Sequence, residues 1–463
     1  MGKNFKKILF FFLLYFFSAC PLFSAGSSFS ARPLQLLPSD RILILATHPD
    51  DEVLACGGII QQAVAMKLPV HIVFFTHGDS NEWSFLMYQK HPVILPRAVR
   101  HMGMVRHDES CVASEILGVP QQQLFFLGYP DYGTLEIWRT HWGEKTPPFR
   151  SVLTRVNRVP YTGAFRFGAP YKGEEILQDL TTLVADFHPT KIFVSHPMDH
   201  HPDHLALYLF ARVALWNLQS KVHSQIYPYL VHYKKWPIPS KEHKNMLLDP
   251  PSSLKDAFVW HSFALTPDQV DRKQEALKAH RTQYNSTPAY LSSFVRSNEL
   301  FGDFPVISLR SDSWMGKTHE MPEHVEDRQS ARFIGVEWHT ARLEENTLIL
   351  SLGLSRPLAR EIGLSLFVFG YRFDRAFVQM PKIHIKIGVL GCDVYDQNQK
   401  LSSHSIQIFR NLHEITVKIP LTLLGNPHKI LTSARTILGE IPVDWVPWRI
   451  IELPADPFAE ELS

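Results

Sequence analysis

The stretch Arg41–Glu52, RILILATHPDDE, decides how the N-terminal half of the chain is read. Its apolar run Ile42–Leu45 has the length of a buried strand, and Leu54–Met66 has the pattern of the helix that follows it. The histidine and the acids at the end of the stretch therefore lie in a strand-to-helix turn. Such turns form the edge of an open α/β sheet where ligands bind, because the strands fix the chain and the loops present side chains.

One histidine and three acids within five residues would repel one another, and burying them uncompensated is unfavourable. A bound cation would remove this conflict. Imidazole and carboxylate suit zinc, so His48 and Asp51, three residues apart, can converge on one ion while Asp50 stays free for proton transfer. The alternative is a solvated turn in which Asp50 or Asp51 only caps the helix.

A second turn of the same kind lies about 150 residues further on, in Ser195–His204, SHPMDHHPDH. It too follows an apolar run, Lys191–Val194, and precedes a helical pattern. His201 and His204 are three residues apart, so the start of one helix can direct both toward a common point. Two strand-ending turns rich in His and Asp can meet at one edge of one sheet.

At this point the sequence resembles a known family, the LmbE-like or PIG-L-like zinc-dependent N-deacetylases. Their two signatures are matched by Ala46–Glu52 and His201–His204, and the resemblance runs from about Asp40 to Phe301. Further likeness lies in Arg106 and Glu109 ahead of Leu117-Gly118, in Gly128–Asp131, and in Lys273–Gln283. Several motifs in the right order make the resemblance specific.

The resemblance implies a role for each matched residue. His48, Asp51 and His204 would bind one Zn²⁺ per chain, with another divalent metal as the alternative, and water would complete the coordination. Asp50 would act as the general base. His201, oriented by Asp203, would stabilise the oxyanion or donate a proton, and the sequence leaves both roles open.

Three further residues are candidates for binding substrate: Arg106, Asp131 and His232. His232 lies in Tyr227–Tyr233, which we predict to be a loop near the sheet edge; a core or surface histidine is the alternative. For Arg106 the alternative is an ion pair with Glu109 or Glu115 along its helix.

Strand and helix patterns alternate in this region, which predicts a Rossmann-like, mostly parallel sheet with flanking helices. The expected strands are 42–45, 70–76, 124–127, 191–195 and 257–260, and the expected helices are 54–66, 104–116, 174–187, 204–216 and 267–279. There is no GxGxxG motif, so we expect no dinucleotide. Between 132 and 172 we predict a long loop whose aromatic and basic residues bind a sugar or pack into a small core of their own.

The start of the chain has the features of an export signal. Lys3, Lys6 and Lys7 precede the apolar run Ile8–Phe17, which is shorter than the ~20 residues of a membrane span. Residues 1–26 are thus a predicted signal peptide, cleaved near Ala25 or lipid-anchored at Cys20. We expect a periplasmic or envelope-associated protein, with membrane attachment through the N-terminus as an option.

Composition sets wider limits. The 463-residue chain is 45% hydrophobic and 20% charged, as a folded globular protein is, and its net charge of +2 gives no reason to expect nucleic acid as a partner. The remaining cysteines, Cys56, Cys111 and Cys392, show neither disulfide-framework nor zinc-site spacing. Oligomeric state cannot be read from the sequence.

The chain changes character after the first domain. We predict a deacetylase-like domain over 34–301, a linker over 302–330, and an antiparallel β-sandwich over 331–455, where the apolar period falls to two. The sandwich carries no histidine pair at ligand spacing, and we expect it to help to place substrate. Trp338, Trp445 and Trp448 are its candidates for stacking on a sugar, with a purely structural cap as the alternative.

The expected function is removal of the N-acetyl group from an N-acetylglucosamine-type amino sugar in an exported or envelope glycan or glycolipid. Two other classes remain open: a metal-dependent phosphoesterase, which would more often use two metals, and a non-catalytic glycan-binding protein on the same fold.

Overall fold

The computed structural model describes residues 30–80, 95–309, 334–358, 362–439 and 441–454, and residues 31–463 group into one compact unit. The predicted signal peptide with Cys20 lies outside the described residues, as does most of the predicted linker. Within the described ranges, none of the helices combines the length and apolar character that a membrane crossing requires.

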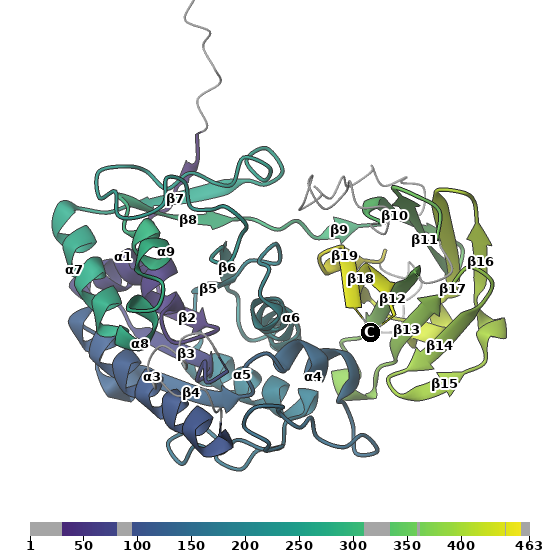
Figure 1. The fold of residues 1–463 in the computed structure, drawn as a ribbon, viewed down its shortest axis with the longest axis horizontal. Coiled ribbons are helices and arrows are strands. Elements are labelled where there is room, and N and C mark those ends of the chain that lie inside the picture. Colours follow the sequence, from purple (N-terminus) through teal and green to yellow (C-terminus); the bar gives the residue numbers. More distant parts are fainter. Residues whose placement is uncertain (1–29, 81–94, 310–333, 359–361, 440, 455–463) are drawn as a thin grey trace, which may run out of the picture. The chain divides into compact units, whose positions relative to one another are not determined.

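The N-terminal part is built on an eight-stranded sheet in the order β1-β7-β8-β6-β5-β2-β3-β4 (Figure 1). From β6 to β4 the strands are parallel, whereas β8 is antiparallel to both of its neighbours. Every residue of β2 is buried, because helices cover both faces of the sheet there. The strands are β1 (Arg32–Pro33), β2 (Ile42–Ala46), β3 (Val70–Thr76), β4 (Leu124–Tyr129), β5 (Lys191–Ser195), β6 (Gln225–Tyr229), β7 (Trp260–Ala264) and β8 (Asn298–Gly302).

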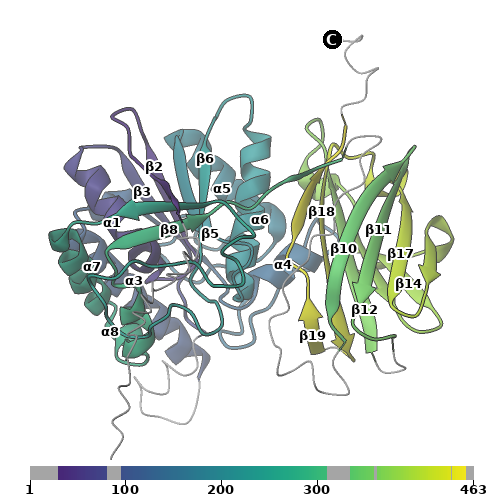
Figure 2. The ribbon, with the colours of Figure 1, turned by 90° about the horizontal axis from the view of Figure 1, so that it is seen from above.

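Helices lie on both faces of this sheet (Figures 1 and 2). On one face α7 packs against α1 and α3, and on the other α6 packs against α4 and α5. The fold class predicted from the sequence is therefore confirmed for this part. The helices are α1 (Asp51–Ala65), α3 (Pro96–Ile116), α4 (Thr134–Thr140), α5 (Gly173–Phe187), α6 (Pro202–Asn217), α7 (Pro267–Ala279), α8 (Arg281–Tyr284) and α9 (Pro288–Leu291), with 3₁₀ turns at η1 (Gln121–Gln123) and η2 (Ser292–Phe294).

Three local predictions are wrong. The strand expected at 257–260 is β7, which begins at Trp260, because its ladder with β8 starts there. The segment 227–229 is the end of strand β6 and not a loop; Pro228 within it lacks an N–H and hides the strand signal. The loop expected over 132–172 contains α4, which at seven residues is too short to show a helical period.

The C-terminal part holds two sheets whose inner faces share one apolar core, which confirms the predicted antiparallel sandwich. Only the pairing of β9 with β20 is parallel among the ladders of the described strands here. One sheet has the order β10 (Val336–Glu344), β11 (Thr347–Leu354), β17 (Glu414–Pro420) and β16 (Gln407–Arg410). The other has the order β15 (Gln399–Leu401), β14 (Cys392–Asp396), β13 (Lys382–Ile387), β12 (Ile362–Tyr371), β18 (Lys429–Leu438), β20 (Arg449–Glu452) and β9 (Ile307–Ser308), with β19 (Ile441–Trp445) on β18. Single 3₁₀ turns lie at η4 (Phe377–Gln379), η5 (Ser403–Ser405) and η6 (Leu421–Leu424).

The outer face of the larger sheet packs against α4 and the chain after it. The Trp138 ring lies 5.9 Å from those of Phe369 and Trp448, and the backbone N–H of Trp142 donates to Gln397 Oε1 at 2.9 Å. Trp448 is only 2% exposed, so its predicted role in stacking on a sugar is wrong. This aromatic contact ties the sandwich to the α/β part.

Candidate metal centre and active site

The two His- and Asp-rich turns lie side by side because β2 and β5 are adjacent parallel strands. One turn joins β2 to α1, and the other joins β5 to α6. Adjacent parallel strands present their carboxyl ends at the same edge of the sheet, so side chains from both turns meet there. The sequence pattern predicted this meeting.

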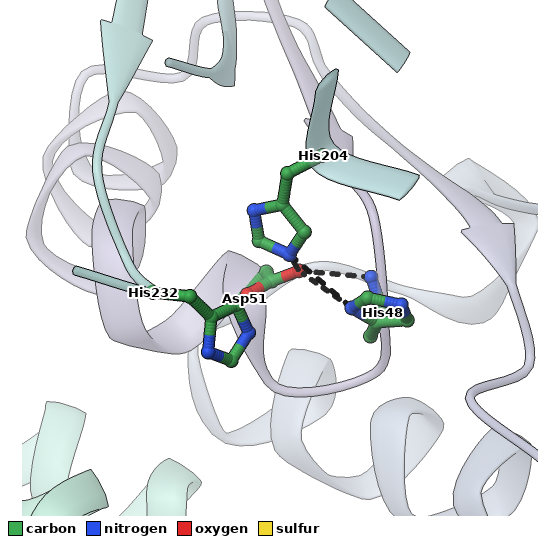
Figure 3. Close-up of side chains that lie close together, drawn as sticks. All are labelled: His48, Asp51, His204 and His232. Atoms are coloured by element: carbon green, nitrogen blue, oxygen red, sulfur yellow. Dashed lines mark hydrogen bonds and ion pairs between the residues drawn. The ribbon is translucent and has the colours of Figure 1, made fainter. Parts of the chain in front are cut away.

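Three side chains converge on one point between these turns (Figure 3). His204 Nε2 lies 3.2 Å from His48 Nδ1 and 3.2 Å from Asp51 Oδ2, and His48 Nδ1 lies 3.5 Å from Asp51 Oδ2. Donors bound tetrahedrally to zinc at 2.0–2.1 Å are about 3.3–3.4 Å apart, so the spacing fits such an ion. His232, from the loop after β6, completes a group of four whose donor atoms lie within 4.8 Å of one another.

The chemistry of these residues also fits a metal. Asp51 is 1% exposed, and its Oδ1 has no hydrogen-bond partner. A buried carboxylate oxygen without a donor is unfavourable unless a cation or another ligand meets it. The alternative of a solvated turn that only caps the helix disagrees with two observations. Asp51 is buried, and the Asp50 side chain makes no capping hydrogen bond to α1.

The far nitrogen of each histidine faces a carboxylate. His48 Nε2 lies 3.1 Å from Asp131 Oδ1, and His204 Nδ1 lies 3.1 Å from Asp199 Oδ2. Metal-binding histidines usually present their second N–H to such a partner, which fixes the tautomer and leaves the first nitrogen free to bind the ion. The geometry thus assigns His48 Nδ1 and His204 Nε2 as the donors.

Asp199 was not predicted, although it lies within the quoted turn. Its Oδ2 accepts hydrogen bonds from the backbone N–H groups of Val231 and His232 at 3.1 and 2.9 Å, and its Oδ1 accepts one from His201 at 2.9 Å. One buried carboxylate therefore holds the loop after β5 against the loop after β6. A sequence pattern cannot show this contact, because the second loop was not recognised as following a strand.

Asp50 has an unusual backbone. Its φ of 118° lies in the left-handed region, which a non-glycine residue adopts only when its surroundings require it. The Asp50 N–H donates to Glu52 Oε2 at 2.9 Å, and Glu52 Oε1 lies 2.8 Å from His280 Nε2. The buried pair of Glu52 and His280 therefore fixes the turn, a role that the sequence analysis did not assign.

Arg106 also holds this turn. Its guanidinium donates to the carbonyls of Pro49 and Gly78 at 2.6 Å each, and it lies 3.6 Å from Asp50 Oδ2. At Gly78, with φ of 59°, a Cβ would lie 2.0 Å from Arg106 Nη1, so only glycine fits. The alternative ion pair with Glu109 is not formed, since Glu109 accepts from α8 instead.

His201 is the N-cap of α6. Its Nδ1 accepts a hydrogen bond from the Asp203 backbone N–H at 3.3 Å, so the neutral ring carries its proton on Nε2. The Asp203 carboxylate is 3.9 Å from His201 Nδ1 and instead accepts from Tyr132 and Thr134. Asp203 thus orients His201 through its backbone N–H, as expected in part, whereas the Asp203 carboxylate fixes the start of α4.

The charges of the site follow from burial and from these neighbours. Burial raises the pKa of Asp50 to about 7, although Arg106 beside it acts in the opposite direction. Burial alone would also raise the pKa of Asp51, but His204 and His48 hold that pKa well below its usual value. Burial and the neighbouring histidines hold the pKa of His201 well below its usual value, so the ring is neutral.

The structure brings every predicted site residue into or beside the two turns. Asp131 and Arg106 were predicted to bind substrate. In the structure both make polar contacts to other protein groups of the site, and their contact with substrate remains a prediction. Asp79, which follows β3 at the same edge, is buried and was missed although its position after a predicted strand was a usable signal. Burial, and next Asp131, raise its pKa to about 7.

Four of the eight aromatic residues of segment 132–172 serve packing. Trp138, Trp142, Tyr161 and Tyr171 are each no more than 4% exposed, which favours the small-core alternative. Tyr132 differs: it is 59% exposed, and its ring lies 4.5 Å from that of His201. Its exposed ring therefore borders the site.

Comparison with protein-family models matches residues 43–215 to PIG-L, described as GlcNAc-PI de-N-acetylase. Residues 43–215 are a PIG-L family domain. The matched PIG-L segment contains both turns and all three converging donors, which confirms the resemblance seen in the sequence.

Solved structures similar to the chain include N,N'-diacetylchitobiose deacetylase from Pyrococcus horikoshii, at 18% identity over 57% of this chain and 82% of that one, with a TM-score of 0.35. The hydratase GalB from Pseudomonas putida is 16% identical over 58% of this chain and 98% of that one, with a TM-score of 0.36. A zinc-inhibited form of teicoplanin deacetylase is 13% identical over 57% of this chain and 97% of that one, with a TM-score of 0.34. At these TM-scores they add no argument to the PIG-L assignment. No curated protein matches the chain significantly.

Proposed function

We propose that the protein is a metal-dependent N-deacetylase of an N-acetylglucosamine-type amino sugar. The observation that carries this proposal is the convergence of His48 Nδ1, Asp51 Oδ2 and His204 Nε2 at 3.2–3.5 Å beside the buried acid Asp50. The family model, which is described by a GlcNAc de-N-acetylase activity, supports the reaction class.

His48, Asp51 and His204 would hold the ion, and His232 offers a fourth donor. Two imidazoles and one carboxylate favour zinc. When bound, zinc acts as a Lewis acid and lowers the pKa of a coordinated water to ~7.

The protein groups around that position suit amide hydrolysis. Asp50 would accept a proton from the attacking water and pass it to the sugar nitrogen as the carbon–nitrogen bond breaks, releasing acetate and the free amine. Arg106 holds the Asp50 turn in place. His201, neutral with its proton on Nε2, would donate a hydrogen bond to the carbonyl oxygen as negative charge develops there.

Tyr132 is the proposed sugar platform. Its exposed ring beside His201 offers an apolar face next to the reacting groups, and amino-sugar rings stack on such faces. Trp445 of the sandwich is half-buried, and its ring centroid lies 6.3 Å from that of His200, in the loop between β5 and α6 that also carries His201. A larger glycan bound at Tyr132 would extend toward Trp445.

A phosphoesterase is the second function to consider, because a two-metal site would support it. A second group of donors, His48, Asp131, His201 and Asp203, lies close by and shares His48 with the first. Its carboxylates are already occupied, since Asp131 accepts from Ser80 and lies against His48, and Asp203 accepts from Thr134. One metal and an amide substrate therefore agree better with the site.

We also propose export to the periplasm or envelope, because Lys3–Lys7 and the apolar run to Phe17 form a signal-peptide pattern. Cell fractionation and the mass of the mature N-terminus test this. A mature chain that begins at Met1 and stays in the cytoplasm would contradict it.

A release assay separates the proposed functions. Purified protein is incubated with N-acetylglucosamine, its phosphatidylinositol glycoside, N-acetylchito-oligosaccharides and peptidoglycan fragments, and acetate and inorganic phosphate are both measured. We expect acetate, its loss on chelation and its return with Zn²⁺. Phosphate release, or glycan retention without any product, would instead support one of the alternatives.

A further inference from the structure

A second site lies where α4 meets the outer face of the larger sandwich sheet. A cavity of about 410 Å³ opens between α4 and strands β12, β13, β14 and β18. None of its lining residues belongs to the metal-binding groups. Its size suits a ligand no larger than a sugar with one substituent.

Positive charge dominates the lining. Arg139 enters from α4, Lys386 from β13 and Arg435 from β18, and none of the three makes an ion pair among the described residues. The acid in the lining, Glu136, accepts a hydrogen bond from Thr140 at 2.9 Å. Asp393, the neighbour of Lys386 on β14, is paired with Lys400 at 2.7 Å.

The two guanidinium groups are fixed but incompletely bonded. Both lie over the ring of Phe367, at 5.2 Å for Arg139 and 5.3 Å for Arg435, and His384 stacks on the same ring at 4.2 Å. The buried Nε of Arg139 and that of Arg435 have no hydrogen-bond partner. These Nε atoms are closed to solvent, so a ligand in the cavity would be bound by the outer guanidinium nitrogens of the two arginines that line it.

The local electrostatics agree with an excess of positive charge, which Glu136 in the lining offsets only in part. Burial and the charge of Arg435 lower the pKa of Arg139 to about 9, although Glu136 acts in the opposite direction. Burial and the charges of Lys386, Arg435 and Arg139 lower the pKa of His384 to about 3. Like charges gathered in a partly buried cavity repel one another, and an anion would reverse that repulsion.

We propose that this cavity binds a phosphate monoester on a sugar-sized carrier, through the guanidinium groups of Arg139 and Arg435 and the ammonium group of Lys386. Planar guanidinium forks bind the oxygens of a phosphate in pairs, and Lys386 adds a point charge. Tyr395 and Asn398 in the lining can bond to hydroxyl groups of the carrier. A neutral sugar lacks the charge that the site requires.

The test measures binding of inorganic phosphate and of glucose 6-phosphate to the full chain by calorimetry and thermal unfolding, at ionic strength held constant with sodium chloride. Glucose and citrate serve as neutral and carboxylate comparisons. We expect saturable binding of both phosphates, tighter for glucose 6-phosphate, and none for glucose. Tighter binding of citrate would assign the site to carboxylates and overturn the phosphate ester.

Variants locate the binding. Arg435→Gln and Lys386→Gln should each weaken it at least tenfold while unfolding without phosphate at the same temperature as the parent or higher, because a repulsion is removed. The control Arg342→Gln, which removes a surface charge paired with Glu344, should bind as the parent does. Two Gln variants guard against the misfolding of one.

The metal centre is the competing site for phosphate. His204→Ala removes a metal donor, and we expect this variant to bind phosphate as the parent does. Loss of binding in His204→Ala with retention in both Gln variants would overturn the proposal, as would the absence of saturable binding in the parent.

Discussion

Asp199 shows how a residue outside the metal-binding set can govern it. It faces His204 Nδ1 and accepts three backbone hydrogen bonds from two loops. The sequence could predict His48, Asp51 and His204, because the family resemblance implies them and their spacing within two turns permits them. It could not assign Asp199, because the role of that residue depends on a loop that approaches from β6.

The first prediction concerns this carboxylate. Asp199→Asn should lower zinc affinity about 10–100-fold, since loss of such a partner weakens the orientation and basicity of the metal-binding histidine. Competition with a chelator measures the affinity. Asp393→Asn, on the sandwich surface, is the matched control, and unchanged affinity in Asp199→Asn would contradict the assignment of the His204 donor atom.

The second prediction concerns pH. Burial raises the pKa of Asp50 and Arg106 opposes that rise, so Arg106→Gln should raise this pKa further. A general base works only when deprotonated, so kcat/KM should increase with pH through this pKa, and its acidic limb should move to higher pH in Arg106→Gln. The exposed Arg97→Gln on α3 should leave the limb in place. An unmoved limb in Arg106→Gln would show that Asp50 does not set it.

At the scale of elements, predictions were good where one element carries its own signal. Strands β3 and β5 and helix α7 lie at the predicted residues, because buried apolar runs and a capping box mark them. Strand β6 was missed because Pro228 interrupts it. Helix α4 was missed because it is short and because its one tryptophan, Trp138, is buried by residues more than 200 positions away. Such long-range packing leaves no local pattern.

A buried histidine in β10 gives the third prediction. Burial and the nearby Arg449 lower the pKa of His339 to about 3 from an unfolded value of 6.5. A lowered pKa means that the unfolded state binds the proton first, so the stability present above pH 6.5 is lost as pH falls toward 3. Between pH 6.5 and 5 the loss from this residue is about 1.5 kcal/mol.

His339→Leu should therefore unfold with a smaller pH dependence than the parent in that range, as measured by urea denaturation at each pH. The exposed His223→Leu should keep the pH dependence of the parent. Equal slopes for the parent and His339→Leu would contradict the neutral burial of His339.

At the scale of the whole molecule, the sandwich and the α/β part are joined by a large aromatic contact. Trp138 and Trp142 pack against Phe377, and β9 from the predicted linker pairs with β20. The sequence predicted both architectures, since each has its own period, but not the contact between them. From the sequence alone, the aromatic residues of 132–172 could bind a sugar as well as pack against another part of the protein.

This contact predicts how a shortened chain would behave. A chain that ends at residue 330 would expose Trp138 and Trp142, and burial of each aromatic side chain contributes about 3 kcal/mol. We therefore expect it to be largely insoluble, as measured by centrifugation and thermal unfolding of any soluble fraction. A soluble, cooperatively folding chain would contradict the structural importance of the contact.

Trp445 tests whether the sandwich helps to place substrate. Trp445→Ala should keep deacetylation of N-acetylglucosamine but raise KM for chito-oligosaccharides several-fold, because its ring lies next to His200 at the border of the site. Trp338→Ala, on β10, is the matched control. Equal kinetics of the parent and Trp445→Ala on both substrates would assign the sandwich a purely structural role.

The central claim is that Asp50 moves protons beside a metal that it does not bind. The most direct test measures zinc content and acetate release in the same purified samples of the parent, Asp50→Ala and His204→Ala. We predict that Asp50→Ala keeps about one zinc per chain and loses at least ~100-fold in turnover, whereas His204→Ala loses the zinc as well. Full activity in Asp50→Ala, or full zinc content in His204→Ala, would contradict the claim.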